Sequence, residues 1–62
     1  MDNYNDYNII IYLDKTIDYI LLEGTTEKIA ISVANEAFNN RTGTDKVMVI
    51  DKDYKTVYTI EL

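Results

Sequence analysis

The chain has 62 residues, with eleven acidic and six basic side chains, no histidine, no cysteine and a formal net charge of −5 at pH 7. The missing histidine and cysteine exclude disulfides, zinc sites with thiolate or imidazole ligands, and nucleophilic cysteine or serine–histidine catalysis. The acidic balance disfavours direct nucleic-acid binding, which needs a basic footprint, and an anionic membrane surface would repel the chain for the same reason.

A chain of this length supports one domain. Because a domain this small buries only ~60% of the surface of its unfolded chain, its stability margin is narrow. Small domains usually gain stability from disulfides, a metal ion or self-association. Without the first two, self-association remains, so we expect a homodimer. No apolar run reaches the ~18 residues of a membrane span, and the acidic, polar start is unlike a signal peptide. We therefore expect a cytoplasmic protein, and the composition, rich in Asn, Ile, Tyr and Lys without Pro or Trp, is typical of low-GC bacteria and their phages.

Residues 1–8, MDNYNDYN, have no hydrophobic period. We interpret them as a flexible N-terminal arm, and residues 9–62 as a single domain. The arm is either a frayed terminus or a tyrosine-bearing segment that orders on a partner.

Residues 9–13 and 16–22 are rich in β-branched and aromatic side chains, which favours two strands. A two-residue loop at Asp14 and Lys15 would join them in a hairpin. Its register places Tyr12 opposite Ile17 and Ile10 opposite Tyr19 on one side of the sheet. A helix over residues 15–23 is the alternative.

Residues 25–41 form the one segment with a clear helical period. Thr25 is the expected N-cap, Glu27 lies in the first turn and Arg41 in the last, as the helix dipole prefers. Gly43 follows the expected end. The apolar side is Ile29, Ala30, Val33, Ala34, Ala37 and Phe38.

Residues 46–50 and 54–62 predict a second hairpin, with its turn at residues 51–53. The fold class is therefore α+β: a small β-β-α-β-β domain whose four-stranded, mostly antiparallel sheet packs on one helix.

One helix can cover only one face of this sheet. We expect it to cover Ile9, Ile11, Ile20, Val47, Val49 and Ile60. The other face would then carry Ile10, Tyr12, Ile17, Tyr19 and Leu21, together with Met48, Ile50 and Val57. An uncovered apolar face rich in tyrosine is typical of a protein interface.

Two patterns of acidic residues are compared with those of a calcium loop and of a catalytic carboxylate pair. Asp51 and Asp53 begin like a calcium loop, but Lys55 occupies the next ligand position and Thr56 replaces the required glycine. The pairs Asp14–Asp18 and Glu23–Glu27 lie near expected exposed turns, whereas a carboxylate pair needs burial or a charged neighbour to act in acid–base catalysis. We expect no catalytic, cofactor-binding or metal-binding residues, and no enzyme.

The sequence favours a small acidic, non-catalytic protein-binding module. One version is a phage or mobile-element inhibitor of a host protein, which would offer carboxylates such as Asp2, Asp6, Asp14 and Asp18 to a basic cleft with tyrosine anchors beside them. The alternative is a structural or assembly module that associates with itself through the uncovered face. The predicted interface residues are Ile10, Tyr12, Ile17, Tyr19, Leu21, Asp14 and Asp18.

Overall fold

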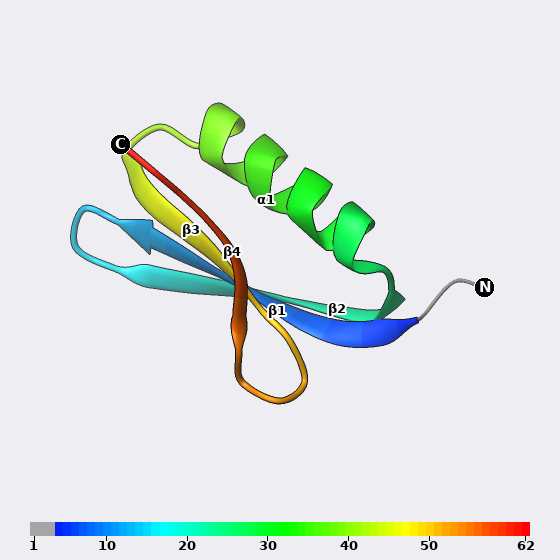
Figure 1. Ribbon diagram of the computed structural model, residues 1–62. Helices are drawn as coiled ribbons and strands as arrows, with labels where there is room; N and C mark the ends of the chain where they lie inside the picture. The colour runs from blue at the N-terminus through cyan, green and yellow to red at the C-terminus, as the bar shows by residue number, and fades with distance from the viewer. Residues whose placement is uncertain (1–3) are drawn as a thin grey trace.

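The computed structural model describes residues 4–62 and shows a four-stranded sheet with a helix across one of its faces (Figure 1). The elements are β1 (Asn5–Leu13), β2 (Ile17–Thr25), α1 (Glu27–Asn40), β3 (Thr44–Ile50) and β4 (Thr56–Glu61). The strand order is β2-β1-β3-β4, and every neighbouring pair is antiparallel. This confirms the predicted β-β-α-β-β domain.

The first hairpin has the predicted register. Tyr12 pairs with Ile17 and Ile10 pairs with Tyr19, and the Leu13 N–H donates to the Thr16 carbonyl at 2.9 Å, which leaves two residues in the loop. The alternative of a helix over residues 15–23 is wrong, because alternating large side chains there pair along the whole length of β1.

Both strands of this hairpin run further than predicted. Residues 5–8, assigned to the flexible arm, belong to β1, whereas residues 1–3 of that arm lie outside the described residues. β2 continues through Gly24, whose φ of +62° suits glycine, into Thr25. The Gly24 N–H donates to the Asp6 carboxylate at 3.0 Å beside a register shift in β1, and this local contact holds the extended ends together.

The helix begins two residues later than predicted. Thr26 is the N-cap, since its hydroxyl oxygen accepts from the Ile29 N–H at 3.2 Å, and the prediction that Thr25 is the cap is wrong because Thr25 is the last residue of β2. Arg41 caps the C-terminus through its N–H to the Ala37 carbonyl, 3.1 Å away, rather than lying in the last turn.

The helix packs mainly over β3 and β1 through small side chains. Ala30 and Ala34 are fully buried, which lets the helix lie close to the sheet. Ile29, predicted to face inward, is 51% exposed instead. No helix in residues 4–62 has the length and apolar content that a membrane span needs.

We call the side of the sheet under α1 the covered face. Its residues are Tyr7, Ile9, Ile11, Ile20, Leu22, Val47, Val49, Tyr58 and Ile60. Ile9, Ile11, Val47 and Val49 have no exposed surface, and all six residues predicted to lie under the helix are in this core. Val57, predicted on the other face, packs against the core because the β3–β4 register shifts beside it.

The second hairpin has a longer loop than predicted, and β4 starts at Thr56 rather than at residue 54. One carboxylate oxygen of Asp51 accepts from the N–H groups of Asp53 and Lys55, both at 2.9 Å. These bonds offer the backbone an alternative to strand pairing, so residues 51–55 form a loop. In Figure 1 this loop projects away from α1, on the opposite side of the sheet.

Candidate protein-binding surface

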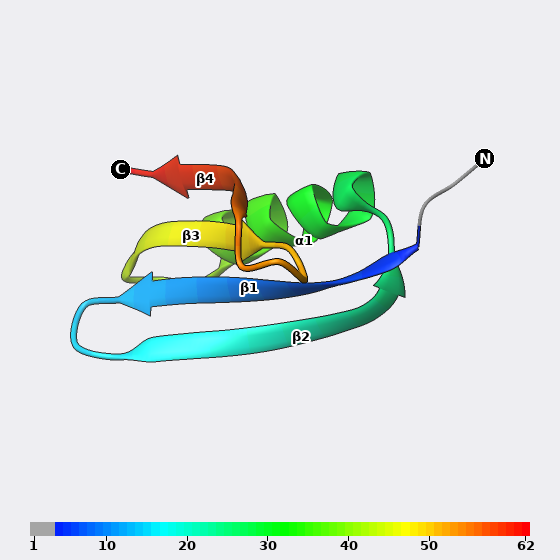
Figure 2. The same cartoon turned by 60° about the horizontal axis from the view of Figure 1, so that its bottom comes forward.

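The side of the sheet that lacks the helix, which we call the open face, consists of three rows of side chains. Residues directly opposite each other in neighbouring strands point to the same side of a sheet. The paired positions give the rows Ile17–Tyr12–Lys46–Glu61, Tyr19–Ile10–Met48–Thr59 and Leu21–Asn8–Ile50–Thr56. Figure 2 turns this side of the sheet toward the viewer.

The large apolar side chains of the open face are exposed to solvent on β2, whereas Ile10, Tyr12 and Met48 are half-buried and Ile50 is buried. Tyr19, Leu21 and Ile17 retain 68%, 59% and 47% of their surface, whereas Ile20 and Leu22, which alternate with them on β2, are partly buried on the covered face. Scattered exposed apolar residues are normal, but several on one flat face form a contiguous patch. The open face therefore has the composition of an interface core, in which tyrosine and methionine are enriched.

Five of the seven predicted interface residues lie together on the open face: Ile10, Tyr12, Ile17, Tyr19 and Leu21. Asp14 lies in the exposed loop that joins β1 to β2, just beyond the Tyr12–Ile17 pair that ends the hairpin. Asp18 lies on the other side of the sheet, paired with Ile11, and its carboxylate accepts from the Arg41 guanidinium at 2.7 Å. The structure thus separates Asp18 from the other six.

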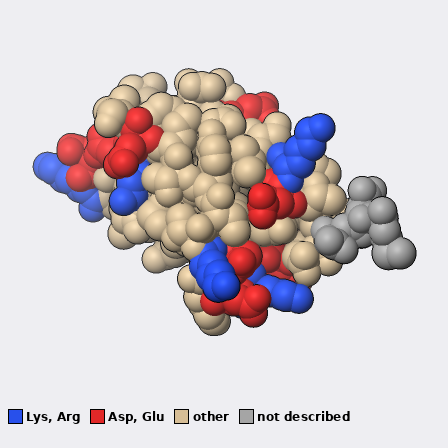
Figure 3. Space-filling model, viewed as in Figure 1, with Lys and Arg blue, Asp and Glu red and all other residues tan. Residues whose placement is uncertain are grey.

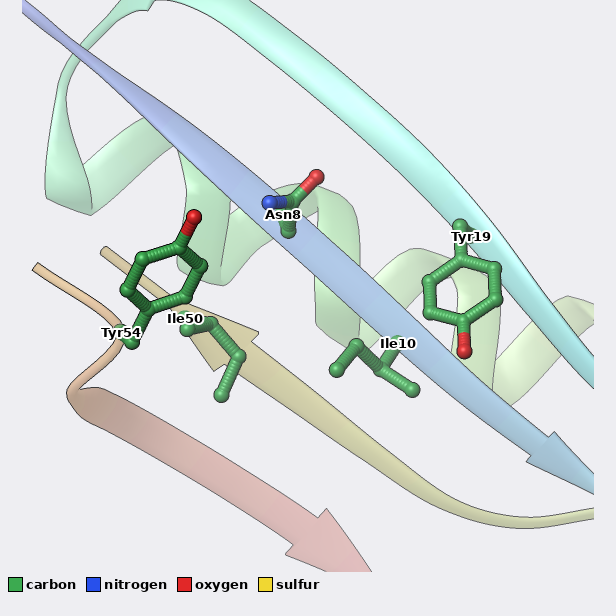
Figure 4. Close-up of a pocket in the computed structure, with 5 residues that line it drawn as sticks. All are labelled: Asn8, Ile10, Tyr19, Ile50 and Tyr54. Carbon is green, nitrogen blue, oxygen red and sulfur yellow. The ribbon is translucent and has the colours of Figure 1, made fainter. Parts of the chain in front are cut away.

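A groove of about 290 Å³ is hollowed into one end of the open face. Its lining residues are Asn8, Ile10, Tyr19, Ile50 and Tyr54. In Figure 4 the rings of Tyr54 and Tyr19 stand on opposite sides of β1, and the aliphatic side chains lie between them. The groove is therefore apolar along its floor, with the Asn8 amide as its polar group.

Tyr54 is held over the groove in an unusual backbone conformation. Its φ is +64°, and it is the one non-glycine residue with positive φ in the described part of the chain. The Tyr54 N–H donates to the Asp51 carbonyl at 3.0 Å, so the Asp51 hydrogen bonds impose this geometry. Positive φ at a bulky side chain costs on the order of 1 kcal/mol or more, which glycine would avoid.

Charge is sparse and balanced on the open face. Lys46 and Glu61 occupy opposed positions in β3 and β4, and the Lys46 ammonium lies 5.1 Å from the centre of the Tyr12 ring. This distance allows a cation–π contact. The other residues of the three rows are uncharged, so the net charge of −5 is not concentrated on this face. Figure 3, which has the view of Figure 1, shows acidic and basic side chains next to each other in several places.

Sequence reasoning missed six members of this surface: Asn8, Lys46, Thr56, Thr59, Glu61 and Tyr54. The alternation that placed Met48 on the open face also predicts Lys46 there, two residues earlier along the same strand. Tyr54 carried no such signal, because tyrosine is a strand former and nothing in its identity predicts a left-handed backbone.

The described residues do not bring metal ligands together: across residues 4–62, no group of three or more acidic side chains could hold a metal ion. Comparison with known proteins finds no matching family model, no matching curated protein and no matching solved structure. The function is consequently inferred from the surface of this chain.

Proposed function

We propose that the chain is a small, non-catalytic protein-binding module and that the open face is its binding surface. The observation that carries this proposal is the exposure of Tyr19, Leu21 and Ile17 on the side of the sheet that lacks the helix. Covering such residues releases ~25 cal/mol for each Å² of apolar surface removed from water, so a protein partner would gain most of its affinity here.

The residue types support binding rather than chemistry. The sequence offers neither histidine nor cysteine, and the groove is lined by aliphatic and tyrosine side chains with one amide. Tyrosine carries large apolar area with little conformational entropy to lose, which makes it a frequent anchor in protein interfaces.

A more specific version concerns the acidic charge. An inhibitor of a host protein, of phage or mobile-element origin and acting in the cytoplasm, would present carboxylates to a basic cleft. Asp14 supports this version, because it is exposed at the rim of the open face beside the row of Tyr12 and Ile17. Such a contact would steer association and weaken as salt is added.

A pull-down with three tagged baits tests the proposal. The baits are the wild-type chain, an open-face variant Tyr19→Thr/Leu21→Thr, and a control Ile29→Gln that replaces an equally exposed apolar residue on α1. Threonine keeps the strand preference of the replaced residues while removing their apolar bulk. Each bait is exposed to low-GC bacterial lysate and to an untagged copy of the chain, at low and high salt.

We expect at least one protein to be retained by the wild-type and control baits and lost from the open-face variant at both salt concentrations. If every retained protein binds all three baits equally, the open face is not the binding surface. A protein that is lost at high salt and depends on Asp14, measured with Asp14→Asn, would identify the basic-cleft version.

A further inference from the structure

We infer that the partner covering the open face is a second copy of this chain, related by a two-fold axis that lies in the plane between the two sheets and runs across the strands. This inference rests on the proposed function and names its partner. It is supported by the area of the face and by the distribution of charge along β3 and β4.

The area of the open face fits a small symmetric dimer. Strands of six to nine residues, rising ~3.3 Å per residue and spaced ~4.8 Å apart, give the face about 500 Å² in projection. Two such faces reach the ~1,000 Å² that a specific interface needs only if nearly the whole face takes part. A second copy supplies a flat apolar face of matching length and width.

A second copy would also complete the layer structure. One helix and one sheet enclose a core in which, among residues 4–62, four large side chains are fully buried. Packing two open faces ~10 Å apart gives the order helix, sheet, sheet, helix, in which every apolar face is covered. Small domains without disulfides commonly gain stability in this way.

The charges on and beside β3 and β4 define the orientation. Lys46 and Glu61 lie at one end of the open face, and the loop containing Asp53 and Lys55 follows the other end. A two-fold axis across the strands reverses the strand direction, so it brings Lys46 and Glu61 of one copy to the Ile50 and Thr56 end of the other copy's face, next to the loop that contains Asp53 and Lys55. An axis along the strands would instead bring both charges of each copy over apolar residues of β1 and β2, where they would lose hydration without a partner.

The same operation sets which part of the partner meets the groove. The β3–β4 loop projects from one end of the face, and the groove beside it lies between Tyr54 and Tyr19 (Figures 1 and 4). Because the axis reverses the strand direction, the loop and the groove of one copy both meet the end of the partner's face that carries Tyr12 and Lys46. The Tyr54 ring, which forms one wall of the groove, therefore lies in the interface.

Sedimentation equilibrium on the full chain from about 1 µM to 1 mM tests the inference. We expect a monomer–dimer equilibrium for the wild type. In Tyr19→Thr/Leu21→Thr the dissociation constant should rise at least about a hundredfold, because each substitution occurs twice in the interface. In the control Ile29→Gln it should stay within about threefold of the wild-type value.

Tyr54→Gly provides a variant whose folding is not in doubt, because glycine adopts φ near +64° without strain. We expect it to remain folded and to weaken the dimer about tenfold or more, since the ring that walls the groove is lost twice. A Tyr54→Gly dimer as tight as that of the wild type would exclude the groove from the interface.

A charge exchange tests the orientation. Lys46→Glu should weaken the dimer about tenfold, and adding Asp53→Lys in the same chain should restore most of the loss, an effect that must act between copies. Within a chain, Lys46 and Asp51, where the loop starts, are separated by five strand steps, on the order of 16 Å. If Asp53→Lys fails to restore the Lys46→Glu dimer, the axis does not run across the strands.

Two outcomes overturn the inference as a whole. A wild type that stays monomeric up to 1 mM has no second copy on its open face; the proposed function then stands only if a different protein is still lost from the open-face bait. A dimer that tolerates Tyr19→Thr/Leu21→Thr is formed elsewhere, for example by pairing of the β2 edges, whose backbone these substitutions leave intact.

Discussion

The two faces of the sheet are built from the same strands and share isoleucine, leucine and tyrosine, yet they have opposite environments. On β1, Ile9 and Ile11 have no exposed surface, while Ile10 between them lies on the groove floor of the open face. Tyrosine shows the same division: the Tyr58 hydroxyl donates to Asn35 of α1 at 3.0 Å, whereas Tyr19 is 68% exposed. Alternation separates the faces, but the placement of the helix decides which of them becomes the core.

The division implies different roles. The covered face carries the stability of the monomer, because its side chains are removed from water as the chain folds. The open face contributes little to that stability and gains its free energy on association. Substitutions at neighbouring positions of one strand should therefore have effects of different size and kind.

The largest expected effect is that of Ile9→Ala. Removing a fully buried isoleucine should lower the free energy of unfolding by about 2–5 kcal/mol, much of the ~3–9 kcal/mol that a domain of this size possesses. The matched change Ile10→Ala on the open face should cost less than about 1 kcal/mol in dilute solution. Urea denaturation followed by circular dichroism measures both, and equal losses would remove the distinction between the faces.

The next effect concerns the close approach of the helix. Ala34 is fully buried against the sheet, so Ala34→Leu should destabilise the fold by about 1–3 kcal/mol through overpacking. Ser32→Leu, on the exposed side of α1, is the control and should be nearly neutral. If Ala34→Leu leaves the free energy of unfolding unchanged, α1 is loosely packed on the sheet. The two faces would then differ less in packing than the burial of their side chains indicates.

A smaller effect tests which threonine caps the N-terminus of α1. Thr26→Ala removes the N-cap of α1 and should cost about 1 kcal/mol, whereas Thr25→Ala, at the end of β2, should cost less. Thermal unfolding of the two variants compares them directly. A larger loss for Thr25→Ala would restore the cap predicted from sequence and contradict the observed Thr26–Ile29 bond.

The smallest effect is expected at the contact between Asp18 and Arg41, which ties the end of α1 to the edge of the covered face. Both side chains are about half exposed, so solvent screens the pair and Asp18→Asn should cost less than about 0.5 kcal/mol. That loss should vanish in about 1 M salt. A loss that is larger, or that salt does not reduce, would show that this contact matters for more than its charge.

Much of the fold could be predicted from the sequence, since local patterns determine it. The two-residue loop at Asp14 and Lys15 and the alternation on either side of it set the register, which in turn placed Tyr12 with Ile17 and Ile10 with Tyr19. The strand order could not be predicted, because the pairing of β1 with β3 joins segments far apart in the chain.

The errors arose where single hydrogen bonds decide a boundary. Thr25 and Thr26 are equivalent as sequence, and only the bond from Ile29 distinguishes the cap. The Asp51 carboxylate likewise converts the expected start of β4 into a loop and turns Tyr54 over the groove. Asp18, in contrast, could have been placed correctly, because it alternates with Ile17 and Tyr19 and so must point to the other side of the sheet.

The most direct test of the account is an isotope-filtered NOE experiment on a mixture of labelled and unlabelled chains at millimolar concentration. We expect contacts between chains from the side chains of Tyr19, Leu21 and Met48 on the open face, and none from Ile29 on the helix. Contacts between chains that arise from Ile29 or from the strand edges, or no contacts at all, would contradict the central claim that the open face is the binding surface and that a second copy covers it.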